Sequence, residues 1–268
     1  MCAARLPRVT VVTPSYNQAG YLKETIESVL SQGYPELEYI IMDGGSTDGS
    51  AELIESYASD LAYWQSEPDA GQSDAIRRGF ERGTGEILAW LNSDDTYEPG
   101  TLHRIGATFA EQRDAAMVYG DYFVLYPDGR KVLKRKIGFD FKICLYSYLM
   151  IPQPSSFWRA DAYKAVGGLD PAFRFAMDYD FFLRMGARFE DQVVHIREPF
   201  STFRVHPTSK SVAEQDSFGG ELRQIRQRFF SGPRWSWKLR KYLYLLKAQS
   251  RFVIERGTLP LRKDRAKA

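Results

Sequence analysis

The 268-residue chain has only two cysteines, Cys2 and Cys144, which is too few for a disulfide framework. This scarcity favours a reducing compartment, so we expect a cytoplasmic protein. The first residues lack the cationic, apolar and small-residue regions of a signal peptide, and none is expected. The longest apolar stretches, such as 143–151, are shorter than the roughly 20 residues that a membrane span requires. These absences argue against a disulfide-stapled secreted domain and against a bilayer-spanning protein.

Acidic residues are scarce in the last part of the chain. Residues 221–268 hold 14 Lys or Arg but only 3 Asp or Glu, a net charge of +11, whereas residues 1–220 have a net charge of −9. An acidic body with a basic end suggests a metal-using domain joined to a segment that seeks an anionic surface. We therefore predict a catalytic domain over 1–220 and a basic, amphipathic helical tail over 221–268.

Three partners are considered for the tail: an anionic membrane, the catalytic body and nucleic acid. It combines its positive charge with aromatic residues that suit the interface of an anionic bilayer, namely Trp235, Trp237, Tyr242, Tyr244 and Phe252. Its apolar stripe could equally dock on the catalytic body. Nucleic acid is not expected as a partner, because no known nucleic-acid-binding module accompanies the charge.

Strand-like and helical patterns alternate along the first third of the chain. Strands are expected at 8–13, 37–42, 61–64 and 87–91, and helices at about 20–32, 53–57 and 73–81. This order predicts an α/β fold with a mostly parallel central sheet and helices on both faces. Further along, we expect an antiparallel hairpin from 122–126 and 131–133, a short helix over 178–188, a strand-like stretch over 200–206, a loop over 207–216, and two helices separated near 232–233.

Two adjacent carboxylates stand where the fourth expected strand ends, in Asn92-Ser93-Asp94-Asp95. Open α/β sheets bind ligands at the carboxyl ends of their strands. Hard oxygen ligands in such a place suit Mg2+ or Mn2+ bridging a diphosphate. A solvated turn explains the same residues equally well, because Asn, Ser and Asp are common in turns.

Two other strand ends carry residues that suit a nucleotide. Residues 13–17 can present backbone amides, a hydroxyl and an aromatic ring, and the loop 43–50 has three glycines and two carboxylates. The loop has neither the spacing of a dinucleotide fingerprint nor that of a P-loop. A tight strand-to-helix turn and a helix cap at Asp48 are the competing interpretations.

Taken together, these segments give the chain a sequence that resembles the family 2 glycosyltransferases, the inverting enzymes of the GT-A fold. The resemblance covers about residues 8–210 and leaves the tail outside. It rests on an ordered set of motifs: Thr13-Pro14-Ser15-Tyr16-Asn17, Ser28-Val29-Leu30-Ser31-Gln32, Asp43-Gly44-Gly45-Ser46-Thr47-Asp48, Asn92-Ser93-Asp94-Asp95, Met177-Asp178-Tyr179-Asp180 and Arg204-Val205-His206-Pro207.

The resemblance assigns a nucleotide-sugar site and a metal site. The family's Asp-Xaa-Asp motif falls on 92–94, which implies Asp94 as the first ligand of Mn2+ or Mg2+, Asp95 as a supporting one, and His206 as the group that completes the coordination. The nucleotide sugar is implied to contact Pro14, Tyr16, Asn17, Asp43, Gln72, Asp74, Asn92, Ser93 and Arg204. Two positions depart from the family pattern, since Asn92 replaces the usual first acid and Gly44 replaces an acid that reads uracil in many relatives.

The later acid, Asp178, is implied as the general base, because an inverting transfer needs a carboxylate to take the proton of the attacking hydroxyl. The usual Glu-Asp pair is Met177-Asp178 here, so only one acid remains. A helix N-cap is the competing interpretation of Asp178. Arg204 is implied to neutralise charge on the diphosphate, and Lys210 could reach the same phosphates or remain in a solvated loop.

Aromatic and polar residues in 153–158 suggest an acceptor pocket, with Gln153 and Trp158 as its candidates. Core packing is the alternative for Trp158. The whole pattern predicts a metal-dependent, inverting glycosyltransferase that moves a sugar from a nucleoside diphosphate, with UDP favoured, to a hydroxyl of a glycan or lipid-linked acceptor in surface polysaccharide synthesis at the inner face of the membrane. The alternatives are a nucleotidyltransferase-like enzyme and a non-catalytic, membrane-associated binding protein.

Overall fold

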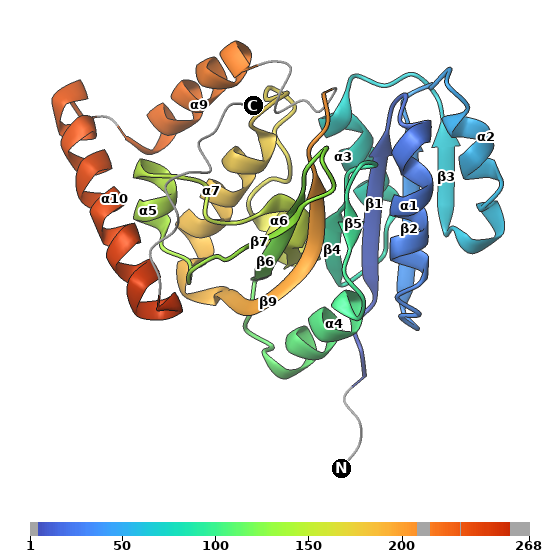
Figure 1. The fold of residues 1–268 in the computed structure, drawn as a ribbon, viewed down its shortest axis with the longest axis horizontal. Helices are drawn as coiled ribbons and strands as arrows, with labels where there is room; N and C mark the ends of the chain where they lie inside the picture. The colour runs from blue at the N-terminus through green and yellow to red at the C-terminus, as the bar shows by residue number, and fades with distance from the viewer. Residues whose placement is uncertain (1–4, 208–214, 231, 258–268) are drawn as a thin grey trace.

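The computed structural model describes residues 5–207, 215–230 and 232–257 (Figure 1). Within this part of the chain, the strands form one nine-stranded mixed sheet in the order β3-β2-β1-β4-β8-β6-β9-β5, with β7 paired to β6. The strands are β1 (Val9–Ser15), β2 (Leu37–Asp43), β3 (Tyr63–Ser66), β4 (Ile87–Trp90), β5 (Thr96–Tyr97), β6 (Met117–Leu125), β7 (Lys131–Lys134), β8 (Ser156–Arg159) and β9 (Val193–Arg204).

The first half of the sheet is parallel, as the alternation of strands and helices predicts. β1 pairs with β2 and β4, and β2 pairs with β3, all in parallel register. Alternate residues of β1 face opposite sides, because successive side chains of a strand point to opposite faces. Val11 therefore packs with the core under one helix layer and Val12 with the other. The helices here are α1 (Ala19–Leu30), α2 (Ser50–Glu55) and α3 (Gln72–Arg82), with a 3-10 turn η1 (Ala58–Asp60).

The second half of the sheet mixes directions. β8 runs antiparallel to both β4 and β6, β6 runs parallel to β9, and β7 closes the predicted hairpin with β6. The elements between these strands are α4 (Thr101–Glu111), α5 (Phe141–Tyr146), η2 (Gln153–Ser155), α6 (Ala160–Ala165), α7 (Met177–Phe189) and η3 (Glu190–Gln192). The α/β prediction with a mostly parallel sheet and a small hairpin is confirmed.

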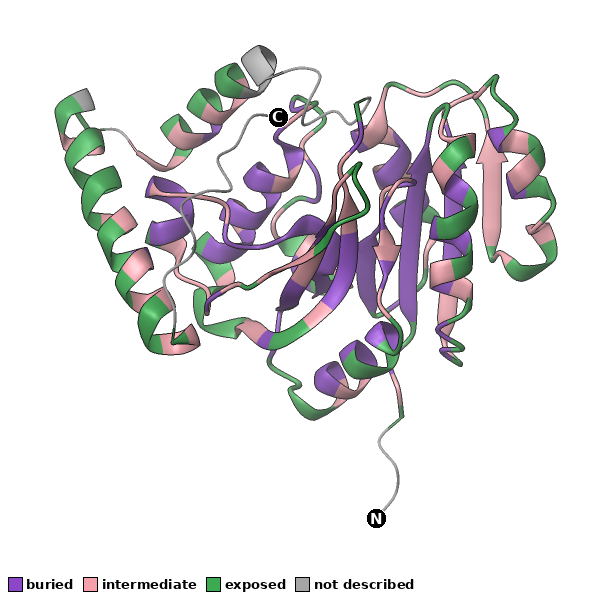
Figure 2. Ribbon diagram, viewed as in Figure 1, coloured by how far each residue is buried: buried purple, intermediate pink, exposed green. Residues whose placement is uncertain are grey.

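Most of the central sheet is buried between two apolar cores, one on each face (Figure 2). The larger core gathers the aromatic side chains of Trp90, Trp158, Phe181 and Phe182 beneath α7. Burial of such rings contributes roughly 1.5–3 kcal/mol each to folding. Cys144 of α5 is a buried free thiol in this core, whereas Cys2 lies outside the described residues.

The tail forms two helices, α9 (Gln215–Phe229) and α10 (Arg234–Arg256), at one end of the molecule (Figure 1). The predicted division at 220 falls inside α9. Residues 215 and 216 of the expected loop are helical, and 208–214 lie outside the described residues. Among the described helices, none combines the length and the apolar character that crossing a bilayer requires.

One side of α10 is docked on the catalytic body. Tyr244 stacks on Tyr146 of α5 with ring centroids 5.2 Å apart, and Ala248 is buried beside it. Arg256 at the end of α10 reaches the buried carboxylate of Asp121 at 2.6 Å. Docking on the body, one of the partners considered for the tail, is therefore present in the structure.

Candidate active site

A single cleft of about 1390 Å³ opens at the carboxyl ends of β1 and β4 and reaches the start of α7. Both acids singled out in the sequence, Asp94 and Asp178, line it. Eight of the predicted site residues contribute to its described lining: Pro14, Tyr16, Gln72, Asn92, Ser93, Asp94, Gln153 and Asp178. The cleft thus brings together residues that are far apart in the sequence.

One wall of the cleft has an aromatic ring beside a glycine and a carboxylate. The side chain of Tyr16 follows β1 and is largely exposed. A Cβ atom at Gly44 would lie 2.9 Å from Asp69 Oδ2 and 3.3 Å from Tyr16 Cδ2. A larger residue at position 44 would require the Asp69 carboxylate to shift, so Gly44 leaves room for the Asp69 and Tyr16 side chains as they stand.

Asp43 and Asn17 stabilise the loop after β2 that contains Gly44. The buried carboxylate of Asp43 accepts hydrogen bonds from the backbone N–H of Gly45 and Ser46, at 3.2 and 2.8 Å. Asn17 has a left-handed backbone with φ of 53°, and its side-chain oxygen accepts from the Thr47 N–H at 2.9 Å. Neither side chain is part of the described cleft lining. Their contacts hold the loop after β2 against the end of β1.

Two of the predicted site residues, Gln72 and Asp74, lie at the start of α3. Gln72 donates through Nε2 to Asn92 Oδ1 at 2.7 Å, which links α3 to the end of β4. Asp74 accepts from the Ala70 N–H at 3.3 Å and lies 3.8 Å from Arg77, outside the described lining. Gln72 therefore faces the cleft, whereas Asp74 stabilises the turn that carries it.

Asp94 lines the cleft and contacts His206, which is not itself part of the described lining. His206 Nε2 lies 2.9 Å from Asp94 Oδ2, although the two residues come from the ends of different strands. The imidazole is buried and its ring packs on Tyr21 with centroids 4.5 Å apart. The structure brings together two of the three residues that the resemblance implied as metal ligands.

Asp95 and Arg204 support this pair from below. Asp95 has no exposed surface and accepts the Arg204 backbone N–H at 3.0 Å. Burial and the neighbouring charge of Asp94 both raise the pKa of Asp95. The Arg204 guanidinium donates to the Asp94 carbonyl at 3.2 Å and pairs with Glu24, so it braces the loop. Neither Asp95 nor Arg204 belongs to the described cleft lining, and Lys210 lies outside the described residues.

The chemistry of these side chains fits a hard divalent ion in part. A carboxylate and an imidazole that converge within hydrogen-bond distance can share one ion. No group of three or more His, Cys, Asp or Glu side chains in the described part of the chain could hold a metal by itself. Asp94 and His206 would therefore need oxygen atoms of a diphosphate and water to complete the coordination, as Mg2+ sites commonly do.

Asp178 stands in the first turn of α7 and lines the cleft. One carboxylate oxygen accepts the N–H of Tyr179 at 2.7 Å. Burial in mostly apolar surroundings raises its pKa to about 6, against the lowering effect of that hydrogen bond. A carboxyl with this pKa is ionised at neutral pH and still basic enough to take a proton.

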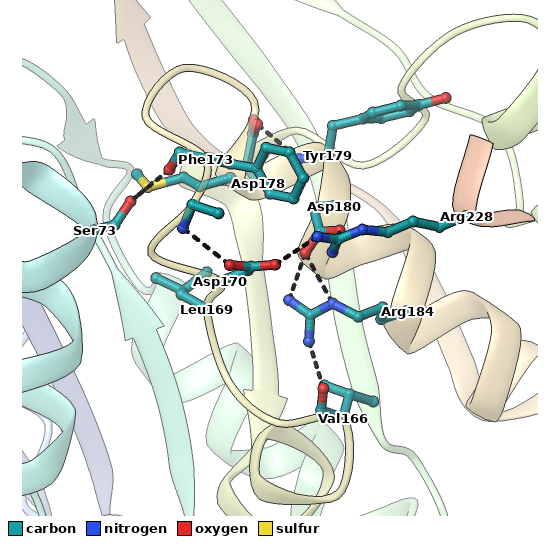
Figure 3. A network of polar contacts seen from close by, with 12 residues as sticks. Ser73, Val166, Leu169, Asp170, Phe173, Asp178, Tyr179, Asp180, Arg184 and Arg228 are labelled. Carbon is teal, nitrogen blue, oxygen red and sulfur yellow. Dashed lines mark hydrogen bonds and ion pairs between the residues drawn. The ribbon is translucent and has the colours of Figure 1, made fainter. Parts of the chain in front are cut away.

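Met177 stands where the usual Glu-Asp pair has its Glu. Its sulfur accepts the Ser73 hydroxyl at 2.8 Å, and Ser73 also contacts the Phe173 carbonyl at 3.0 Å (Figure 3). The thioether fixes the start of α7 against α3 without adding a charge next to Asp178. The described cleft lining has three carboxylates, Asp69, Asp94 and Asp178, and of these only Asp178 belongs to α7.

The acid limb of the pH profile should reveal this carboxyl. If Asp178 is the general base, as the resemblance implies, only its ionised form can take a proton, so log kcat/KM should rise with unit slope below about pH 6 and level off above it. The measurement is kcat/KM from pH 4.5 to 8.5 under saturating metal. A profile that is flat between pH 5 and 7 would show that no such carboxyl controls the free enzyme.

The loop before α7 is held by the tail. Glu221 of α9 accepts the backbone N–H groups of Arg174, Phe175 and Ala176 at 2.9, 2.9 and 2.8 Å. Arg228, also on α9, lies between Asp170 and the buried Asp180 at 2.9 and 3.0 Å (Figure 3). The sequence offered no signal for these contacts, because they join residues more than 40 positions apart.

Removal of the Glu221 carboxylate should loosen this loop. Glu221→Ala leaves three backbone donors unpaired, so we expect a loss of about 2 kcal/mol in the free energy of unfolding and a lower kcat. Urea unfolding and turnover would measure both effects. Arg223→Ala, an exposed change on the same helix, is the matched control and should alter neither. Equal stability of Glu221→Ala and the unmodified protein would contradict the role of this contact.

The two acceptor candidates differ in position. Gln153 lines the cleft, donates to the Trp90 carbonyl at 2.7 Å and accepts from Asn92 at 3.2 Å. Trp158 has no exposed surface and packs edge to face against Trp90, with ring centroids 5.1 Å apart. The placement of Trp158 favours core packing, and only Gln153 can contact a molecule in the cleft.

Comparison with known proteins gives one family. The model of the family described as Glycosyl transferase family 2 matches residues 10–160. An uncharacterized glycosyltransferase of Mycobacterium tuberculosis is 31% identical over 183 residues, covering 66% of this chain and 68% of its own. A PGL/p-HBAD biosynthesis glycosyltransferase of Mycobacterium bovis is 30% identical, with coverages of 66% and 69%.

Solved structures share the fold at low sequence identity. TarS of S. aureus, residues 1–349 in complex with UDP-GlcNAc, superposes with a TM-score of 0.67 and 16% identity, covering 94% of this chain and 76% of that one. The chain spans 43% of a longer TarS chain. The mannosyltransferase PcManGT from Pyrobaculum calidifontis, in complex with GDP-Man and Mn2+, has a TM-score of 0.57 and 19% identity, with coverages of 96% and 66%.

Proposed function

Because the chain belongs to glycosyl transferase family 2, we propose that it transfers a sugar, with inversion, from a nucleoside diphosphate to an acceptor hydroxyl and needs a divalent ion to do so. One observation carries this proposal: Asp94, which pairs with His206, and Asp178 line the same cleft although they are far apart in the sequence. A displacement at a sugar carbon has two ends, a departing diphosphate and an attacking oxygen. The two acidic positions suit these two ends.

Asp178 serves the attacking end in this proposal. Its carboxylate takes the proton of the acceptor hydroxyl as the oxygen forms a bond to the anomeric carbon. The bond between that carbon and the diphosphate oxygen breaks on the opposite side, so the configuration inverts. Because its pKa is raised to about 6, the Asp178 carboxylate is ionised at pH 7 and is still basic enough to accept the proton.

Asp94 and His206 serve the leaving end. When bound there, Mn2+ or Mg2+ would supply the positive charge that stabilises the departing diphosphate. Asn92, held by Gln72 and Gln153, presents an amide beside this pair, where it can hydrogen-bond a ribose or a phosphate oxygen. The exposed aromatic ring of Tyr16 can stack on the base of the nucleotide.

A thermal-shift screen would test the donor. UDP-, GDP- and dTDP-sugars are added with Mn2+, and one class should raise the melting temperature, because a ligand of the native state stabilises it by mass action. We favour UDP-sugars, and structural neighbours were solved with UDP-GlcNAc and with GDP-Man. If no nucleotide sugar shifts the melting temperature at millimolar concentration, the proposal fails.

The acceptor we propose is a glycan or a lipid-linked molecule of surface polysaccharide or glycolipid synthesis. A relative named for PGL/p-HBAD biosynthesis supports this class. The outer side of α10 supports a peripheral place at the anionic inner face of the cytoplasmic membrane. Large apolar residues are exposed along it, with 69% of Trp235, 60% of Tyr242 and 82% of Ile254 open to solvent. Lysines such as Lys238 and Lys241 flank them, a combination typical of interfacial helices.

Vesicle flotation would test this surface. The protein should float with vesicles that contain phosphatidylglycerol and not with pure phosphatidylcholine vesicles. Leu239→Ala with Tyr242→Ala should weaken binding by about tenfold or more, because each side chain buries apolar area in the interface. The exposed Ser250→Ala on the same helix is the control. Self-association of the protein without vesicle binding would contradict the membrane and favour a second copy as the partner of α10.

A further inference from the structure

Lys136 is a cation inside the cleft that the proposed reaction does not use. It follows β7, and its backbone N–H donates to Asp121 Oδ1 at 2.7 Å. Its side chain lines the cleft together with Tyr122, Leu149 and Ile151. This wall contains none of the residues assigned above to the nucleotide or the metal.

The ammonium group of Lys136 has no carboxylate partner among the described residues. Its Nζ lies 3.5 Å from the Leu149 carbonyl and 5.4 and 5.9 Å from the ring centroids of Tyr122 and Tyr148. The nearby carboxylate of Asp121 is already bound by Arg256, which contacts both of its oxygens at 2.6 and 2.8 Å. A positive charge without an ion-pair partner is therefore aimed into a partly enclosed space.

Lys136 and Asp178 line the same cleft. Both side chains also lie near Cys144 of α5, since the charge of the lysine lowers the pKa of this buried thiol and the charge of the carboxylate raises it. A molecule bound in the cleft next to Asp178 can therefore have a part that faces Lys136.

We propose that Lys136 binds an anionic group, a phosphate or a carboxylate, on the acceptor molecule. The inference rests on the proposed function, because it places the acceptor beside Asp178. The ammonium, which donates only a long hydrogen bond of 3.5 Å to the Leu149 carbonyl, gains a charge-assisted hydrogen bond when such a group enters. The nearby Tyr122 and Tyr148 rings make the surroundings of that bond less polar than water, which strengthens it. A neutral sugar would leave the cation uncompensated.

The pKa of Lys136 without a ligand agrees with an anion-binding site. Burial lowers the pKa of Lys136 to about 8, although the charges of Cys144 and Asp121 act in the opposite direction. The lysine is therefore charged at pH 7 and partly neutral above pH 8. An anion that binds the charged form must raise this pKa, so occupancy of the site can be measured as a change in amine reactivity.

Pulsed acetylation of the full chain with mass spectrometry tests the proposal. Lys136 should react with an apparent pKa of about 8, and sn-glycerol 3-phosphate or glucuronate, but not glycerol or glucose, should slow its modification by about threefold or more at saturation. The phosphate and carboxylate arms distinguish the two sources of negative charge. UDP with Mn2+ should leave the reactivity of Lys136 unchanged.

Lys136→Met and Lys142→Met give the matched pair of variants, since Lys142 is an exposed lysine on α5. Calorimetry with the protecting anion should show binding to Lys142→Met and none to Lys136→Met, with cooperative thermal unfolding showing that both variants are folded. Protection by UDP, or by neither anion, would overturn the assignment. The donor screen is independent of it: a nucleotide-sugar hit without anion protection sinks this proposal alone, and the absence of any hit sinks the proposed function.

Discussion

Asp178→Asn is expected to lower kcat by about 10²–10⁴-fold, the usual contribution of a general base. The amide has nearly the shape of the carboxylate but cannot accept a proton from the acceptor hydroxyl. Donor affinity should stay within about twofold of the unmodified protein, because in the proposed reaction Asp178 contacts the acceptor hydroxyl and not the diphosphate. Steady-state kinetics and calorimetry with the donor identified by thermal shift would measure the two effects.

The same variant should be more stable at neutral pH. Burial raises the pKa of Asp178 from 3.8 to about 6, so folding favours its protonated form. The stability from this group is complete below pH 3.8 and is lost as the pH rises through 6. Asn removes that loss, and we expect a gain of about 1–2 kcal/mol in the free energy of unfolding at pH 7.5, since the side chain is partly open to the cleft.

Asp191→Asn is the control, because Asp191 is an exposed acid of η3. It should change neither kcat nor the pH dependence of unfolding. A large loss of donor binding in Asp178→Asn would place Asp178 at the donor instead. An unchanged kcat would remove it from the reaction.

Asp94→Ala is expected to weaken Mn2+-dependent donor binding by about 100-fold or more, since the ion loses its carboxylate ligand and His206 loses its partner at 2.9 Å. Binding of the donor without metal should change little. Calorimetric titration of the donor with and without Mn2+ would separate the two quantities. Turnover should fall by at least the same factor, because the ion acts on the departing group.

Asp114→Ala, at an exposed position before β6, is the control for removal of an acid. Its metal dependence should equal that of the unmodified protein. If Asp94→Ala keeps the full response to Mn2+, then Asp94 is not a ligand, and the pair with His206 has only a structural role.

The parallel half of the fold could be predicted because its signals are local. Each of β1, β2 and β4 is a short buried run, and α1 repeats its apolar residues at helical spacing. α4 and β8 were not predicted. β8 is only four residues long and is defined by its pairing with β4 and β6, which no local pattern reveals.

The same limit applies to the site. Asp94 and Asp178 could be nominated from motifs, yet only the fold brings them to one cleft. Asp95, beside Asp94 in the sequence, is fully buried, because its carboxylate accepts the Arg204 backbone N–H and the Asn92 amide. Lys136 and Glu221 carry no motif, and their roles depend on distant contacts with Asp121 and with the loop before α7.

A crystal structure of the protein with Mn2+ and the nucleotide sugar found by thermal shift would test the central claim most directly. We predict the diphosphate and the ion at Asp94 and His206, with the sugar between them and Asp178 and its anomeric carbon facing the Asp178 carboxylate. A donor bound with its sugar turned away from Asp178, or an ion bound without Asp94, would contradict the account.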